Sequence, residues 1–442
     1  MTELTEPEVK LEALLGIINS SARQAIAEYK KTGHGVPSAD ATTFHPLDMA
    51  TDTLALRKAT RLLEGAYHQL SAILAPPQHT VMNFVFDYNW ACTDVALRAR
   101  FADVLEQHPE GLSVDKLAEA VNLDKSKTAR VLRALSLMGC FKEVERDVFT
   151  NTRLSLILKS TNNTGCYAQT HSRDVSKYAG VLYETMTDQE FSRSHEVEKA
   201  PRVFACRKEG TEESFWDMMK KDDERRDIFH RGMLGYSEMT GTSTFLHQYH
   251  WDNNTNHDLP EVMVQAQNAW EKDAPDALFD GRVELVPNNF LEDIPAAGKD
   301  VYYLRHILHD WPDAEATMIL RNVRKAMGPN SVVLIRPYLA LDDCILLHTF
   351  QEPGVGTTEG LSIDPQAPEP MLPNFGAGSH GVYQIDLTMW FLVNAKERTL
   401  DEMKIIAQVP YNSSLTRRAT AGLALTQVYD LVETMVMEFR IA

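Results

Sequence analysis

The chain has 442 residues and a mass of 49.8 kDa, which is more than one ordinary core encloses, so two packed units are expected. Its 44% hydrophobic and 24% charged residues are typical of soluble globular proteins and argue against a disordered or fibrous chain. A net charge of -18 would repel a phosphate backbone or an anionic membrane, so neither nucleic acid nor a membrane is expected as a partner.

The first predicted elements are two amphipathic helices. Leu11, Leu14, Leu15 and Ile18 follow the spacing that places side chains on one helical face. A second helix over 56–74 ends before two prolines, because proline cannot continue the hydrogen-bond ladder. These helices have no obvious core of their own. Their apolar faces therefore pack within the chain or against a second copy of it.

Residues 95–155 are typical of a winged helix-turn-helix, with three short helices followed by a hairpin. Lys125, Lys127, Arg130 and Arg133 on the third helix suggest contacts with DNA phosphates as one interpretation. The alternative is a solvated face on a module used for dimerisation. The negative charge of the whole chain favours this alternative.

The second half alternates strands and helices. A strand over 299–304, a helix over 314–327 and a strand over 331–335 predict a parallel sheet. The segment between Ala340 and Tyr383 is too long for a routine connection and resembles a lid or an insertion. A helix over 383–394 follows, and Thr399 and Glu402 form a predicted capping box for another. Two antiparallel strands are expected at the end of the chain.

The expected fold class is mixed α and α/β. Residues 1–165 are assigned to a helical winged-helix dimerisation domain and residues 166–442 to a Rossmann-like domain. Five scattered cysteines without a CxxC pair indicate neither a disulfide framework nor a zinc site, and no metal is assigned. Acidic residues near the N-terminus are unlike a secretory signal, so a cytoplasmic protein is expected.

Chemistry-bearing residues gather after the strand that ends at Leu304. The string RHILHDWPDAE places Arg305, His306, His309 and Asp310 near the carboxyl edge of the sheet, where open parallel sheets bind ligands. A neutral imidazole accepts a proton near physiological pH, so His309 is a candidate general base. A histidine beside an aspartate also occurs in purely structural roles.

The strings YLRHILHDWPDAEATMILRNVRKAM and NAKERTLDEM, with the winged module before them, closely resemble plant- and fungal-type small-molecule O-methyltransferases that use S-adenosylmethionine. The likeness spans roughly residues 95–403. It implies that His309 deprotonates the acceptor hydroxyl and that Glu397 assists it. It also implies that Arg305 lies near the cofactor.

The chain departs from the family at the cofactor loop, which is a strand, a glycine-rich turn, a helix and a second strand. Only six residues, DNNTNH, separate Trp251 from the DLP string that begins at Asp258. Such a unit needs about 30 residues, so the glycine cradle is absent. Asp258 remains where the family holds the ribose hydroxyls, and Asn289 stands where it usually has an acid near the adenine. Both are candidate vestigial cofactor-binding residues.

Two further features concern polar groups after strands. The family usually has an acid after the strand that follows HDW, whereas this chain has Arg336. Arg336 either pairs with an acid such as Glu397 or faces a ligand as a hydrogen-bond donor. The string GAGSHG over 376–381 matches a dinucleotide motif in letters. It follows no strand, so it is not interpreted as a nucleotide loop.

Fungal proteins that resemble O-methyltransferases include pericyclases, which guide dehydration and Diels-Alder or Alder-ene cyclisation of polyketide-derived intermediates, some without the cofactor. The sequence is similar to that subset, so the expected function is a cofactor-independent pericyclase. The protein is also expected to form a homodimer through its N-terminal domain. Arg336 is the leading candidate for a hydrogen-bond donor to a substrate carbonyl, and Arg305 is the second. His309 and Asp310 are the candidates for proton transfer. The expected walls of the cavity are Met233, Met389, Trp390 and Phe391.

Three other functions are compatible with the sequence. An active methyltransferase would have to hold S-adenosylmethionine through Asp258, Asn289 and Arg305 alone. A non-catalytic partner would dimerise with a true methyltransferase through its N-terminal helices. A DNA-binding regulator is disfavoured by charge. Loss of an exon would produce the same sequence.

Overall fold

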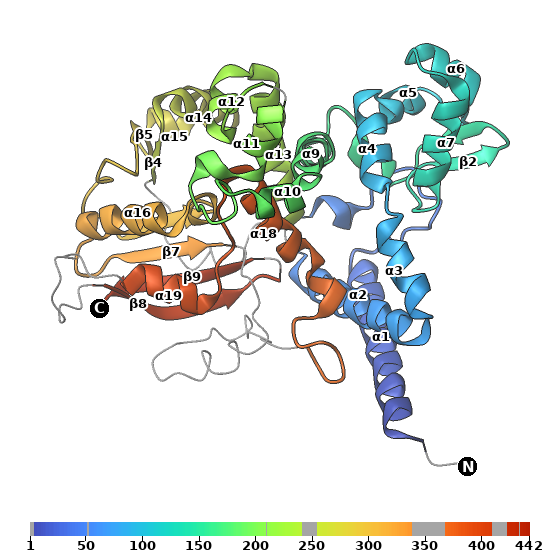
Figure 1. Cartoon of the computed structure of the whole chain (residues 1–442), viewed down its shortest axis with the longest axis horizontal. Coiled ribbons are helices and arrows are strands. Elements are labelled where there is room, and N and C mark those ends of the chain that lie inside the picture. Colours follow the sequence, from blue (N-terminus) through green and yellow to red (C-terminus); the bar gives the residue numbers. More distant parts are fainter. Residues whose placement is uncertain are drawn as a thin grey trace. The chain divides into compact units, whose positions relative to one another are not determined.

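The computed structural model describes residues 4–50, 53–208, 210–240, 254–337, 367–408, 422–432 and 434–442. These residues divide into two compact units (Figure 1). The first is built from the chain up to residue 242, with 368–380 and 391–393. The second contains the remainder. None of the helices within the described ranges is long and apolar enough to cross a membrane.

The first unit is almost entirely helical. Its elements are α1 (Glu6–Lys31), η1 (Pro46–Met49), α2 (Leu54–Leu74), α3 (Pro77–Val85), α4 (Asn89–Arg98), α5 (Phe101–Glu106), β1 (Leu112–Ser113), α6 (Val114–Ala120), α7 (Lys125–Ser136), β2 (Lys142–Glu145), β3 (Val148–Thr150), η2 (Ser155–Leu158), α8 (Asn163–Thr170), the π-helix η3 (His171–Val175), α9 (Ser176–Ala179), α10 (Leu182–Thr187), η4 (Val197–Lys199), α11 (Pro201–Lys208), α12 (Phe215–Lys221), α13 (Asp223–Thr240) and η7 (Gly376–Ser379).

Helices α4 to α7 and the small sheet β1-β3-β2 confirm the predicted winged helix. The first of the three expected helices is split into α4 and α5, because Arg100 adopts a left-handed conformation between them. The basic side chains of α7 are engaged within the module: Lys125 pairs with Asp115 at 2.8 Å, and Arg133 pairs with Glu143 at 2.6 Å. These intramolecular pairs favour a solvated face over a DNA-binding one.

The first unit continues past residue 165, where a domain boundary was expected. Helix α13 packs closely on α8, and a Cβ at Gly235 would collide with the backbone of Asn163. Two helices can approach this closely only where a residue lacks a side chain. The expected boundary therefore falls inside a continuously packed helical unit, and the division lies near residue 242 instead.

The GAGSHG segment also packs against a helix. A Cβ at Gly378 would collide with the backbone carbonyl of Arg61 in α2, and one at Gly65 would collide with the carbonyl of Phe375. The guanidinium of Arg61 lies over the Phe375 ring at 3.9 Å. Gly378 in this segment and Gly65 in α2 therefore permit the two to pack closely, which is a structural role for one glycine of the motif.

The second unit carries the sheets. Its elements are β4 (Asn254–Asp258), α14 (Pro260–Asp273), α15 (Pro275–Phe279), β5 (Val283–Pro287), β6 (Val301–Arg305), η6 (Leu308–Asp310), α16 (Asp313–Ala326), β7 (Val332–Arg336), α18 (His380–Val393, with its two ends in the first unit), α19 (Leu400–Gln408), β8 (Leu423–Asp430) and β9 (Met435–Ile441). The predicted parallel pair β6–β7 and the antiparallel pair β8–β9 are both confirmed.

The described strands of this unit form two separate sheets, β4-β5 and β6-β7-β9-β8. A doubly wound sheet has the order 3-2-1-4-5-6, with the phosphate-binding turn after its central first strand. By chain order and parallel pairing, β4 and β5 correspond to strands 2 and 3, and β6 and β7 to strands 4 and 5. Among the described residues, the place of the first strand between β4 and β6 has no strand.

The six residues taken as a bare linker are partly a strand. Residues 254–257 of that stretch, with Asp258, form β4 and pair in parallel with β5 over Val283–Pro287. The element that follows the family's cofactor turn is thus present, whereas no residues are left to build the turn and its helix before it.

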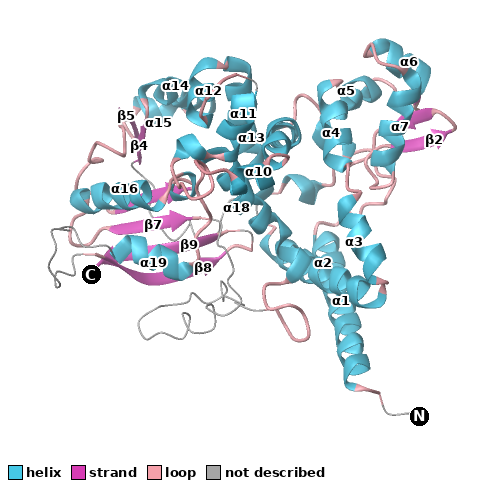
Figure 2. Ribbon diagram, viewed as in Figure 1, coloured by secondary structure: helices cyan, strands magenta, loops and turns pink. Residues whose placement is uncertain are grey.

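Helices α16 and α19 cover one face of the four-stranded sheet (Figure 2). Ile319, Leu320 and Met403 of these helices share a core with Val333 and Ile335 of β7. Since side chains alternate along a strand, Leu334 and Arg336 lie on the opposite face. The core thus holds β6 and β7 rigidly, with the ends of both strands at one edge.

Candidate active site

The segment that carries His309 begins where β6 ends. His306 has a φ of 52°, and its backbone N–H donates to the carbonyl of Arg336 at 3.0 Å, so the chain leaves the sheet sharply while staying attached to β7. The short helix η6 then places His309, whose side chain is 9% exposed. The histidine therefore lies at the carboxyl edge of the sheet, as predicted.

Arg398 fixes this segment from the other side. Its fully buried guanidinium donates to the carbonyls of Leu308 at 2.6 Å and Trp311 at 2.7 Å, and to Asp313 at 2.9 Å. Carbonyls on both sides of His309 are thereby held by one planar group. The KERT string thus contains both Glu397, the predicted partner of His309, and Arg398, whose hydrogen bonds orient the His309 loop.

His309 and Glu397 form a buried pair. The Nδ1 atom of His309 lies 2.5 Å from Oε1 of Glu397, and the Glu397 side chain is fully buried. The backbone N–H of Glu397 donates to Asp386 of α18 at 2.8 Å, which fixes the position of the residue. Asp310 lies on the other side of the ring, with its Oδ1 3.5 Å from Nε2.

The charges of the pair follow from its surroundings. Burial disfavours a charge on the imidazole, but the carboxylates of Glu397 and Asp310 outweigh it and raise the pKa of His309 to about 9. Burial raises the pKa of Glu397 against the opposing effect of His309, and burial likewise raises that of Asp310. The short Nδ1–Oε1 contact favours an imidazolium paired with the Glu397 carboxylate at neutral pH, and the two groups titrate as a unit.

Arg336 lies at the end of β7 and is 2% exposed. Its Nε donates to Thr434 Oγ1 at 3.1 Å, while its buried Nη2 has no hydrogen-bond partner among the residues that the structure describes. Within the described ranges no carboxylate forms an ion pair with it, and Glu397 pairs with His309 instead. The interpretation that Arg336 pairs with Glu397 is therefore wrong.

The two residues proposed as remnants of a cofactor site make local contacts. Asp258 Oδ1 accepts from the N–H of Leu259 at 2.8 Å, and its carbonyl accepts from Asn288. Asn289 Oδ1 accepts from the N–H of Leu291 at 3.2 Å, as in an ordinary Asx turn. With no glycine cradle beside them, these residues do not fit S-adenosylmethionine.

The residues expected to line a substrate cavity are divided between the two units. Met233 lies on α13 in the first unit and is 37% exposed. Met389 and Trp390 belong to the part of α18 in the second unit, and Phe391 belongs to the first. Their assignment as cavity walls stays a prediction.

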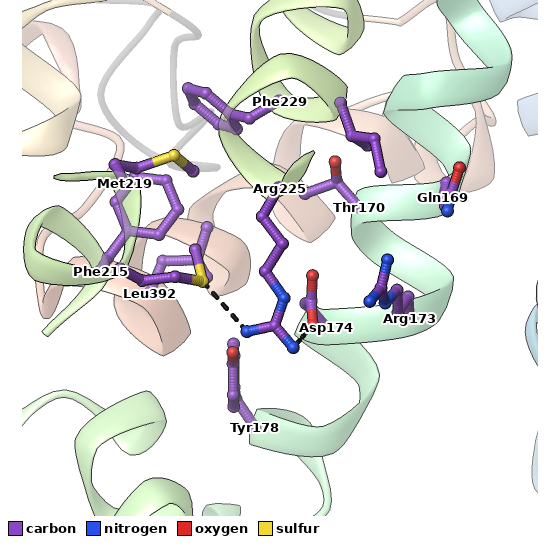
Figure 3. Close-up of a pocket in the computed structure, with 12 residues that line it drawn as sticks. Gln169, Thr170, Arg173, Asp174, Tyr178, Phe215, Met219, Arg225, Phe229 and Leu392 are labelled. Atoms are coloured by element: carbon purple, nitrogen blue, oxygen red, sulfur yellow. Dashed lines mark hydrogen bonds and ion pairs between the residues drawn. The ribbon is translucent and has the colours of Figure 1, made fainter. Parts of the chain in front are cut away.

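The first unit holds a pocket of its own beside the π-helix η3 (Figure 3). Arg225 crosses it, donating to the sulfur of Met218 at 3.3 Å and pairing with Asp174 at 3.6 Å. The free space inside it is about that of one water molecule. A substrate of several rings does not fit there, so this pocket is not the candidate active site.

Sequence reasoning missed two residues of the site, Asp386 and Arg398. Arg398 lies next to Glu397 in the same string, so the family motif could have pointed to it. Asp386 lies inside a helix whose pattern predicts only burial, and nothing local indicates that it accepts from the Glu397 backbone.

Known proteins of similar sequence identify the family to which these motifs belong. A family model described as the O-methyltransferase domain matches residues 240–344. The "3-O-methyltransferase 2" of Phanerochaete chrysosporium is 32% identical to this chain, with 98% of each covered. The chain belongs to the O-methyltransferase family. The alignment with that family member runs over 469 positions, so at least 27 of them have no counterpart among the 442 residues of this chain.

Solved structures show the same family fold. The mitomycin 7-O-methyltransferase MmcR aligns with a TM-score of 0.61 and 21% identity, over 84% of this chain and 100% of its own. A structure described as "A Pericyclic Reaction enzyme" aligns with a TM-score of 0.62 and 17% identity, over 90% of this chain and 96% of its own. The O-methyltransferase fold of this chain is therefore also found in an enzyme named for pericyclic chemistry.

Proposed function

We propose that this member of the O-methyltransferase family is a cofactor-independent pericyclase that acts on a reactive polyketide-derived intermediate. The observation that carries the proposal is the six-residue interval between Trp251 and Asp258, most of which forms β4. The interval leaves no backbone to enclose a nucleoside. The fold of the named pericyclic enzyme supports the proposal by analogy.

The retained pair suits dehydration. His309 is an imidazolium at neutral pH, so it can donate its Nε2 proton to a hydroxyl as the C–O bond breaks and water leaves. The neutral imidazole then takes a proton from the neighbouring carbon, which restores the imidazolium and leaves an alkene. Glu397 stabilises the charged ring at the start and at the end.

In this proposal Arg336 stabilises the negative charge that develops on the substrate during cyclisation. Its buried Nη2, which makes no hydrogen bond to the described part of the chain, can donate to a substrate carbonyl, and the donation strengthens as charge moves onto that oxygen during cyclisation. The remaining requirement is a surface that holds the alkene in one reactive conformation. We also propose that the protein is a cytoplasmic homodimer joined through its first unit.

A second candidate is an S-adenosylmethionine-dependent O-methyltransferase. It is favoured by the intact His309–Glu397 pair and by the named activity of the Phanerochaete chrysosporium relative. This function needs cofactor binding without the glycine cradle.

The experiment that separates the two measures the mass of the product. The purified full chain is incubated with polyketide-type alcohols that form dienes on losing water, with and without S-adenosylmethionine. We expect products of unchanged mass or lighter by one water, formed equally in both conditions. Arg336→Met should slow the reaction by about 100-fold to 1000-fold, as for removal of one preorganised donor. A product heavier by one methylene, formed only with S-adenosylmethionine, would establish the second candidate.

A further inference from the structure

Two arginines end neighbouring strands at the same level. Arg305 and Arg336 are register partners across the parallel pair β6–β7, where neighbouring strands lie about 4.8 Å apart. Register partners in a sheet lie on the same face. Tyr302 and Val333 belong to the core under α16 and α19, so three residues later both arginines lie on the opposite face.

Placing a partly buried guanidinium, Arg305, beside a buried one, Arg336, is unfavourable unless a negative charge joins them. The imidazolium of His309 adds a third positive charge nearby. Burial lowers the pKa of His306 well below its ordinary value, and the charges of His309 and of both arginines lower it further. His306 is therefore neutral and contributes no further charge.

The carboxylates of the surrounding elements are engaged elsewhere. Glu397 and Asp310 face the ring of His309. On β9, Glu438 lies on the same face as Arg336 but pairs with Arg440 at 2.8 Å. Within the described ranges, the contacts of Arg336 leave its buried Nη2 without a hydrogen-bond partner. Among the described residues no carboxylate neutralises Arg336, so the anion of a ligand would find an unmatched positive charge there.

We infer that Arg305 and Arg336 form an anion subsite that binds a carboxylate or enolate oxygen pair of the substrate. The inference rests on the proposed function and narrows it, because it restricts the substrate to acidic polyketide-type molecules. A guanidinium presents parallel N–H donors that match two oxygens, which suits arginine better than lysine for this role. The anion then sits beside the acid His309, so its position also fixes which hydroxyl receives the proton.

The test uses calorimetric titration of the full chain with three probes: salicylate as a carboxylate, dimedone as an enolate, and salicylamide as the neutral match of salicylate. We expect salicylate or dimedone to bind at least about tenfold more tightly than salicylamide. Arg336→Met should remove this preference. The control Arg282→Met removes a guanidinium that is 53% exposed in the same unit and should retain the preference. Preferred binding of the carboxylate alone or of the enolate alone identifies which acid the subsite takes.

Thermal unfolding gives an independent readout. Arg336→Met should melt at the same temperature as the wild type or higher, because it removes a buried charge that no described carboxylate offsets. Salicylate should raise the melting temperature of the wild type and leave the variant unchanged. A variant that fails to fold or melts lower, or one that still prefers salicylate over salicylamide, would overturn the inference. None of these results depends on whether S-adenosylmethionine binds, so the proposed function is tested separately.

Discussion

At the scale of single residues, the His309–Glu397 pair determines how the site responds to pH. A histidine whose pKa is raised on folding stabilises the folded state fully below its unfolded value of about 6.5. That contribution is lost as the pH rises through the folded value of about 9. The site should therefore work as an acid over the neutral range and fail in alkaline solution.

The substitution Glu397→Gln tests whether this carboxylate raises the pKa of His309. Without the carboxylate, burial outweighs Asp310, so the pKa of His309 should fall from about 9 to below its ordinary value. Histidine ring NMR over a pH series measures it. Glu402→Gln removes a carboxylate of the same segment that pairs with Lys396 instead, and it should leave the His309 titration in place. An unchanged His309 titration in Glu397→Gln would show that the pair does not set the charge of the site.

The sequence predicts these site residues unequally. His309 and Glu397 belong to short strings with a family resemblance, so both are predictable from the amino-acid sequence alone. The contacts of Arg336 are not predictable in this way. Whether Arg336 pairs with Glu397 or faces a ligand depends on groups that are far apart in the chain. Asp386 was missed for the same reason, because its acceptor role arises only when α18 meets the KERT segment.

At the scale of elements, periodicity predicted most of the second unit, including the β6–β7 pair and the capping box in which Thr399 and Glu402 exchange hydrogen bonds. Strand β4 was not predicted. Its sequence, NTNHD, has no run of branched or aromatic residues, and its pairing with β5 outweighs this weak intrinsic preference.

The contact of α2 with the GAGSHG segment gives a test at this scale. Gly65→Ala should destabilise the protein by about 1–3 kcal/mol, because the new methyl group collides with the Phe375 carbonyl. Gly16→Ala, in the middle of α1 with nothing near its Cβ position, should instead stabilise by about 0.5–1 kcal/mol. Urea unfolding measures both. Equal effects of the two substitutions would mean that α2 and this segment do not touch as described.

At the scale of the whole molecule, the division between units could not be read from the sequence. Helices α8 to α13 show no change of composition at their start, and the close packing at Gly235 that joins them to the first unit is a property of the fold. The absence of the cofactor turn is itself a prediction from the sequence, because it follows from a count of residues between two recognisable strings and needs no structure.

The homodimer belongs to this scale too. The region of α3 leaves several large apolar side chains exposed, a patch unusual for a monomer: Val81, Phe84, Val85, Phe86, Tyr88 and Trp90. Light scattering should give the mass of two chains for the wild type and of one for Phe84→Asp. Phe279→Asp, at a 90% exposed phenyl group in the second unit, should remain dimeric. A wild-type protein with the mass of one chain would contradict this arrangement.

The central claim is that the chain cannot enclose S-adenosylmethionine, and equilibrium dialysis with labelled S-adenosylmethionine tests it most directly. A family member with an intact glycine turn serves as the positive control. The account predicts that this chain shows no binding tighter than about 1 mM, because six residues between Trp251 and Asp258 cannot form the cradle. Saturable binding in the micromolar range would contradict it.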